Sequence, residues 1–227
     1  MKHCFAVLFL LSITFNQVNA QTNGTALFDE SYVHSIELTF DNPNFWDTLQ
    51  THYDEMMGDF FSEGTGIKQY IPASCIIDGN LLDSVGVRQK GNYSNWGAPG
   101  DKKPLKLDFN EFISGQKHDG LKKLNLSNGF QDPSMLRDVL SYKMMRDAGI
   151  AAPRTSFAKV YLNGTYWGLY VLVEQVNKEF LSNNFNNKNA NLFKCIDNTD
   201  FLWQGTNPVD YEDEFELKTN EVLNDWT

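Results

Sequence analysis

The sequence predicts an α+β protein built mainly from an antiparallel sheet with packed helices. Two tight-turn signals support this prediction, because Gly79-Asn80 and Asn163-Gly164 each join two strand-like runs into a hairpin. A few helix patterns lie between the strands, which is an order typical of the α+β class. The chain has 227 residues, enough for one domain, and its 17 Phe, nine Tyr and five Trp exclude a disordered polar chain.

The predicted strands are short apolar or alternating runs bounded by turn residues. They cover residues 33–40, 70–78, 81–90, 105–109, 121–126, 155–162, 165–174 and 191–195.

Three segments have helical features. Asn42-Pro43 precedes a run in which Phe45, Trp46, Leu49, Tyr53 and Met56 lie close to helical spacing. Asp132-Pro133-Ser134 is a strong helix start, and Gly149 is a suitable left-handed end for that helix. Residues 178–185 form a third helical pattern, whereas residues 91–103 read as a polar loop.

The N-terminal segment has the pattern of an export signal. Lys2 and His3 precede a 12-residue apolar run, and Val18-Asn19-Ala20 matches a signal-peptidase site. The run is shorter than the roughly 20 apolar residues that span a bilayer, although a buried N-terminal helix is an alternative. We therefore expect a signal peptide at 1–20, a linker at 21–32, a domain at 33–227, no membrane span, and a secreted or extracytoplasmic location.

Two cysteines remain after removal of such a signal peptide, Cys75 and Cys195. They can form a disulfide in an oxidising compartment, but each lies in an apolar strand-like run where a buried free thiol is equally plausible. The sequence leaves both alternatives open. No cysteine and histidine spacing indicates zinc, and we predict no metal site.

The charge is unevenly distributed. The chain has a net charge of −10, which argues against a dedicated nucleic-acid-binding protein. Residues 88–123 nevertheless contain eight Lys or Arg and four Asp or Glu, while residues 196–227 contain nine Asp or Glu and one Lys. A basic middle segment on an acidic protein attracts an anionic ligand; the alternative is a solvated sheet face.

Candidate ligand contacts follow from these segments. Arg88 and Lys90 alternate on a strand and share one face before the Gly91-Asn92 loop, and Lys106 stands between two leucines of another strand. Asp138, near a helix start, is a possible partner for a strand lysine, with a surface position as its alternative. The apolar strand 166–173 ends abruptly in a polar connector, Glu174-Gln175.

Taken together, these segments resemble the CotH kinase family, the secreted atypical protein kinases named after a spore-coat protein. The resemblance covers residues 33–227, and its most specific parts are VRQKGNYS, KLDFNEF, GLKKLNLSNGFQDPSMLRD, AGIAAPR, VYLNGTYWGLYVLVEQVNKEFL and ELKTNE. It implies a divergent protein-kinase-like fold with a nucleotide cleft between two lobes. It also implies ATP- and Mg²⁺-dependent phosphate transfer to Ser or Thr of a protein substrate.

The resemblance also implies roles for individual residues. Lys106 would contact the phosphates with Arg88 and Lys90, Asp138 would pair with Lys106, and Lys218 of ELKTNE would face the cleft. Glu174 and Gln175 would mark the hinge beside the adenine. The family domain continues past ELKTNE to an acidic WDxDW-like motif, which Asn224-Asp225-Trp226 does not match. We therefore expect the catalytic and metal-binding carboxylates beyond Thr227, and an incomplete C-terminal part of the domain that is inactive alone.

Two other functions remain as alternatives. One is a non-catalytic exported surface or adhesion module that uses the same fold to bind a partner. The other is a carbohydrate-binding domain, suggested by the tryptophans and by Tyr93 and Trp96 in the 91–103 loop.

Overall fold

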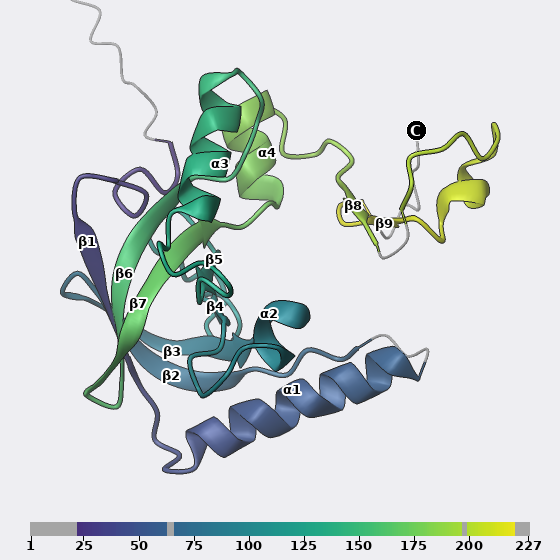
Figure 1. Cartoon of the computed structure of the whole chain (residues 1–227). Coiled ribbons are helices and arrows are strands. Elements are labelled where there is room, and N and C mark those ends of the chain that lie inside the picture. The colour runs from purple at the N-terminus through teal and green to yellow at the C-terminus, as the bar shows by residue number, and fades with distance from the viewer. Residues whose placement is uncertain (1–21, 63–65, 197–198, 221–227) are drawn as a thin grey trace, which may run out of the picture.

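The computed structural model describes residues 22–62, 66–196 and 199–220. The predicted signal peptide at 1–20 lies outside these described residues. The structure is a mixed α/β fold whose main feature is a closed barrel of seven strands, in the order β1-β2-β3-β4-β5-β7-β6 (Figure 1). The neighbouring strands pair antiparallel except for β1 and β6, which pair in parallel and close the barrel.

The barrel strands agree closely with the predicted runs. Their bounds are β1 Val33–Thr39, β2 Ile71–Ile77, β3 Asn80–Gln89, β4 Leu105–Asp108, β5 Lys123–Ser127, β6 Thr155–Leu162 and β7 Thr165–Glu174. Both predicted hairpins are present, with Asp78–Gly79 turning between β2 and β3 and Asn163–Gly164 turning between β6 and β7.

The interior of the barrel is filled by alternate side chains of its strands. These residues are apolar and almost fully buried, and burial of each larger side chain, such as Leu, Ile or Val, contributes about 1.5–3 kcal/mol. They include Ile36, Leu38, Ala73, Cys75, Ile77, Val85, Val87, Leu105, Leu107, Leu124, Leu126, Ala158, Val160, Leu162, Tyr170 and Leu172. The residues between them point to the outside, so the leucines that flank Lys106 face the core and Lys106 itself faces outward.

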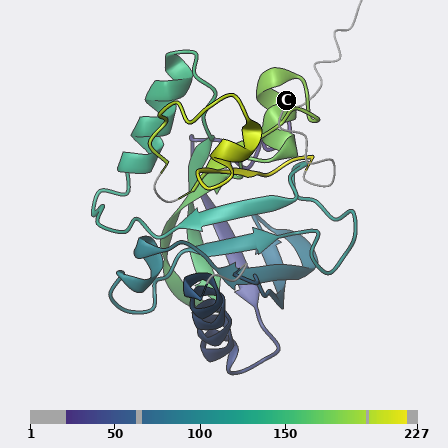
Figure 2. The ribbon, with the colours of Figure 1, turned by 90° about the vertical axis from the view of Figure 1, so that its right-hand side faces the viewer.

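Four helices and a C-terminal hairpin accompany the barrel in the described part of the chain. The helices are α1 Phe45–Phe61, the single turn α2 Tyr93–Trp96, α3 Arg137–Asp147 and α4 Lys178–Phe185. A short hairpin of β8 Phe193–Cys195 and β9 Phe215–Leu217 follows, with the 3₁₀ turn Pro208–Tyr211 between its strands. In Figure 2 the C-terminal segment crosses in front of the barrel strands.

Three local features differ from the expectations. Helix α3 begins at Arg137, because Asp132 uses its carboxylate to accept hydrogen bonds from the backbone N–H groups of Ser134 and Arg137 and so forms a capping turn. The 91–103 segment contains α2 as well as loop. The 22–32 part of the expected linker carries Leu27 and Phe28, which are buried in the core.

Both cysteines that were considered for a disulfide are free thiols. Cys75 is completely buried inside the barrel, and burial raises its pKa to about 12. Cys195 is exposed on β8. Among the described residues, no helix combines the length and the apolar character needed to cross a membrane.

Candidate anion-binding site

Strands β3, β4 and β5 bring three polar side chains into one row on the outside of the barrel. In the strand register Arg88 lies opposite Lys106, and Lys106 lies opposite Asn125. Residues paired in this way stand on the same face of a sheet and interact directly. Lys90 follows at the end of β3, so the structure brings together Arg88, Lys90 and Lys106, which we call the cationic cluster.

The cationic cluster is crowded and partly removed from solvent. Burial lowers the pKa of Lys106 to about 7, and the positive charges of Arg88, Lys90 and Lys123 act in the same direction. Burial and the charge of Arg88 likewise lower the pKa of Lys90 to about 8. Clustered cations with depressed pKa values are costly unless a ligand compensates them, so they are typical of functional sites.

The carboxylates near the cluster leave it uncompensated. The negative charge of Asp108 favours the charged form of Lys106. The Asp108 carboxylate, however, is ion-paired with the amine of Lys123 at 2.7 Å. Asp138 lies within electrostatic range of Lys90. Among the described residues, however, no carboxylate forms an ion pair with any member of the cationic cluster.

Arg88 has unused hydrogen-bonding capacity. Its side chain is only 8% exposed, and its guanidinium lies over the ring of Tyr70 at 5.4 Å. One Nη donates to the carbonyl of Gln89 at 2.8 Å, while the buried Nε has no partner. An unsatisfied buried donor is costly, and a bound anion would satisfy it.

Lys106 is held by an amide instead of the expected carboxylate. Its Nζ donates to the Oε1 of Gln175 at 2.6 Å, and the Nδ2 of Asn125 donates to the same oxygen at 3.2 Å. Gln175 therefore belongs to the site through its side chain. The expected pair between Asp138 and Lys106 is not formed, because the Asp138 carboxylate accepts a hydrogen bond from the Ser127 hydroxyl at 3.2 Å.

Asp138 instead lines a small hollow next to the cluster. This hollow has a volume of about 260 Å³ and also involves Ser94, Ser127, Asn128 and Arg137. It combines hydroxyl, amide and guanidinium groups with the carboxylate of Asp138, so it is a mixed polar surface and not a purely cationic one.

Glu174 is the last residue of β7, and Gln175 is the first residue of the connector that follows. Its side chain is 2% exposed and forms a two-point ion pair with Arg154, with oxygen–nitrogen distances of 2.6 and 3.0 Å. Its backbone N–H donates to the carbonyl of Arg154 at 2.9 Å. The Glu174 side chain and N–H are therefore both engaged by Arg154, and the place of Glu174 in a hinge beside the adenine stays a prediction.

The C-terminal hairpin adds charges that sequence reasoning had only partly identified. Lys218 is ion-paired with Glu216 on β9. Burial lowers the pKa of Lys68, and the positive charges of Lys218, Arg88 and Lys194 lower this pKa further. Lys68 therefore lies within electrostatic range of both Lys218 and Arg88, a member of the cationic cluster. Lys68 was missed because it lies in an irregular segment before β2 with no motif around it.

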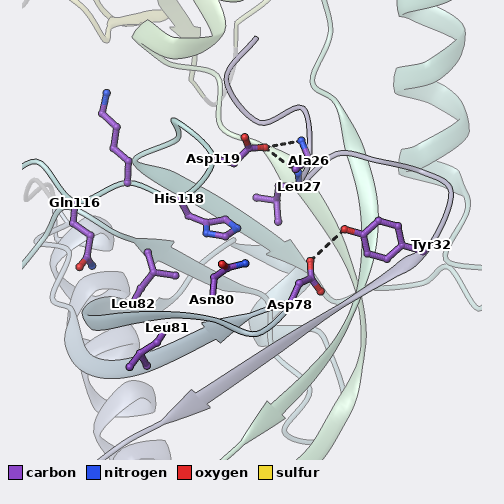
Figure 3. A pocket seen from close by; sticks show the side chains of 11 residues that line it. Ala26, Leu27, Tyr32, Asp78, Asn80, Leu81, Leu82, Gln116, His118 and Asp119 are labelled. Atoms are coloured by element: carbon purple, nitrogen blue, oxygen red, sulfur yellow. Dashed lines mark hydrogen bonds between the residues drawn. The ribbon is translucent and has the colours of Figure 1, made fainter. Parts of the chain in front are cut away.

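A second hollow lies at another edge of the barrel (Figure 3). Its volume is about 520 Å³, and its lining includes Tyr32, Asp78, His118 and Asp119. Asp78 bonds to the ring Nδ1 of His34 at 2.6 Å, and Asp119 accepts from the N–H groups of two residues in the 22–32 segment. Because its two carboxylates hold the N-terminal segment and β1 in place, we assign this hollow to structure and not to ligand binding.

Comparison with known proteins identifies relatives of the chain. Residues 87–227, more than half of the sequence, match the protein family described as CotH kinase protein. A stretch of 63 residues is 32% identical to the inner spore coat protein H of Bacillus subtilis (strain 168). That alignment covers 28% of this chain and 17% of the Bacillus protein, so it relates only a small part of the relative to this chain.

Proposed function

The chain belongs to the CotH kinase family, and on this premise we propose that it binds the polyphosphate of ATP on the outside of β3, β4 and β5. The observation that carries this proposal is the uncompensated cationic cluster, where two lysines and a buried arginine share one surface. Phosphate oxygens accept hydrogen bonds from such groups and cancel their mutual repulsion. Lysines that contact β- and γ-phosphates are a recurrent part of phosphoryl-transfer sites.

The residues have distinct tasks in this proposal. Arg88 offers its unpartnered Nε to a phosphate oxygen, while Lys106 and Lys90 provide ammonium donors. Arrival of the anion raises the pKa of both lysines, so each is fully protonated in the complex. ATP supplies the transferable γ-phosphate. The proposed fold is a divergent kinase-like one, in which the barrel forms one side of the nucleotide cleft.

The described residues supply no ready-made group of protein ligands for magnesium. Among the described residues there is no group of three or more His, Cys, Asp or Glu side chains that is able to hold a metal ion. We therefore assign no step to Mg²⁺ in this chain. Transfer of phosphate to Ser or Thr of a protein substrate remains the reaction that family membership implies, while the activity proposed here is nucleotide binding.

A location outside the cytoplasm fits this proposal. The Bacillus relative is named as a spore coat protein, and the first 20 residues of this chain have the pattern of an export signal. We infer a secreted or extracytoplasmic protein whose partner is a protein substrate.

Calorimetric titration of the purified chain with ATP, pyrophosphate and adenosine tests the function. We expect ATP and pyrophosphate to bind and adenosine to bind at least about tenfold more weakly, because charge-assisted hydrogen bonds are worth about 1.5–3 kcal/mol each. Arg88→Ala should weaken ATP binding about tenfold, and Lys159→Ala, on an exposed position of β6, should leave it unchanged. Absence of ATP and pyrophosphate binding would refute the proposal.

A non-catalytic surface-binding module is the second candidate function. Phe201 and Trp203 are 74% and 76% exposed. Trp203 also lines an apolar hollow of about 600 Å³, together with Tyr211 and Phe215. Exposed apolar groups gathered in this way are typical of interaction surfaces. If this function is the correct one, beads coated with the wild-type chain will adhere to the cells that produce the protein, and beads coated with the Trp203→Ala variant will adhere less. The wild-type chain will then not bind ATP.

A further inference from the structure

The partner of Lys106 is unusual for a half-buried lysine, because it carries no charge. The Gln175 Oε1 accepts from the Lys106 Nζ at 2.6 Å and from the Asn125 Nδ2 at 3.2 Å. Buried lysines are normally paired with carboxylates. The amide fixes the position of the ammonium group while leaving its charge available to another ligand.

The hydrogen bonds determine the orientation of the Gln175 amide. Its Oε1 faces two donors, and its Nε2 donates to the carbonyl of Val176 at 2.9 Å. The flipped amide would direct its NH₂ group against the Lys106 and Asn125 donors and its oxygen against a carbonyl, so only one orientation satisfies all three contacts.

Asn125 supports this arrangement from the neighbouring strand. Its side chain is 7% exposed, and its Nδ2 also donates to the carbonyl of Val173 at 3.3 Å. Asn125 thereby links β5 to the end of β7, immediately before the connector that carries Gln175. A buried, satisfied amide pair of this kind limits the positions that the Gln175 side chain adopts.

We propose that Gln175 and Asn125 are positioning residues that hold the Lys106 ammonium group in the anion site without neutralising it. This inference rests on the proposed function of the cationic cluster. It gives the Gln175 side chain a role in addition to the expected backbone hinge. It also gives a role to Asn125, which makes no contact with the nucleotide in the proposed function. A carboxylate at position 175 would compete with the phosphate for the same ammonium group.

The test compares Gln175→Glu, Gln175→Met and Asn125→Leu with the wild-type chain. Pyrophosphate affinity is measured by calorimetry, and the titration of the Lys106 amine is followed by NMR on lysine labelled with ¹³C at Cε. Lys106→Arg identifies the signal. The other charged groups around Lys106 are Arg88, Lys90, Lys123 and Asp108, and all of them are retained in these variants.

A positioning role predicts a distinct response to each change. Gln175→Glu should raise the pKa of Lys106 by more than about one unit and weaken pyrophosphate binding about tenfold, because a nearby opposite charge stabilises the ammonium form and competes with the ligand. Gln175→Met and Asn125→Leu keep a similar volume without the hydrogen bonds, and should weaken binding about threefold or more. Thr165→Glu adds the same charge at the exposed start of β7 and should change neither measurement.

The outcomes separate this proposal from the proposed function. If Gln175→Glu and Gln175→Met leave both the Lys106 titration and pyrophosphate affinity as in the wild type, the positioning role is wrong while nucleotide binding stands. If Gln175→Glu shifts the Lys106 titration but the wild-type chain does not bind pyrophosphate, the contact with Lys106 is supported and the assignment of the site to phosphate is wrong. Asn125→Leu covers the case in which the substitutions at position 175 fail to fold.

Discussion

The Nζ of Lys106 and the Oε1 of Gln175 lie 2.6 Å apart although the two residues are 69 positions apart in the chain. Lys106 belongs to β4, and Gln175 follows directly after β7. Strand β5 lies between β4 and β7 in the barrel and carries Asn125 in register with Lys106. The contact therefore depends on the strand order of the barrel.

Removal of the Lys106 charge should abolish most anion binding. Lys106→Ala is expected to weaken ATP binding by about 10- to 100-fold, since a hydrogen bond to a charged group is worth about 1.5–3 kcal/mol. Calorimetry measures the affinity, and circular dichroism verifies that the variant is folded. An unchanged ATP affinity in a folded Lys106→Ala protein would contradict the assignment of this lysine.

Anion affinity should fall as the pH rises above neutrality. The pKa values of Lys106 and Lys90 in the free protein are lowered to about 7 and about 8, so Lys106 is half deprotonated near pH 7 and Lys90 near pH 8. Binding must then restore the protons, and affinity should decrease by up to about tenfold per pH unit for each lysine. Calorimetry with ATP at pH 8 and 9, in two buffers of different ionisation enthalpy, measures both affinity and proton uptake.

The Lys106→Arg variant is the control for this pH dependence. Arginine stays protonated throughout the range, so the variant should show a flatter profile and smaller proton uptake than the wild type. Equal profiles for the two proteins would show that Lys106 does not titrate between pH 7 and 9.

The buried pair of Arg154 and Glu174 should matter for stability more than for binding. Arg154→Met leaves the buried Glu174 carboxylate without its ion-pair partner, and breaking such a pair costs about 3–5 kcal/mol. Urea denaturation measures the loss in the free energy of unfolding. Because the Glu174 side chain is engaged by Arg154, ATP affinity of the folded variant should stay within about twofold of the wild type; a large loss would place Glu174 in the ligand site.

The free thiols of Cys75 and Cys195 should react at very different rates. Cys195 is exposed, whereas Cys75 is inside the barrel with its pKa raised to about 12 by burial. Because the thiolate is the reactive form, a maleimide should label Cys195 within minutes and Cys75 only after addition of denaturant. Peptide mass spectrometry distinguishes the two sites. A disulfide-linked peptide containing both cysteines would contradict the structure.

The sequence by itself determined the hairpins, the short strands and helices, and the positive charge of the candidate site. The hairpins at Gly79-Asn80 and Asn163-Gly164 depend on turn residues, and the outward direction of Lys106 depends on its flanking leucines, so both are encoded by near neighbours. The resemblance to the CotH kinase family likewise rests on short sequence segments. For the same reason, Arg88 and Lys90 were expected to share a face.

Only the tertiary structure decided which groups meet. Barrel closure through the parallel pair of β1 and β6, the amide partner of Lys106 and the approach of Lys68 depend on strand order and on contacts between distant segments. Asp138 was expected as the partner of Lys106 because the resemblance to kinases implies a pair between a helix carboxylate and a strand lysine, but a local pattern contains no information about the distance between elements. Glu174 and Gln175 are adjacent in the chain, yet Glu174, at the end of β7, pairs with Arg154, whereas Gln175, in the connector, accepts a hydrogen bond from Lys106.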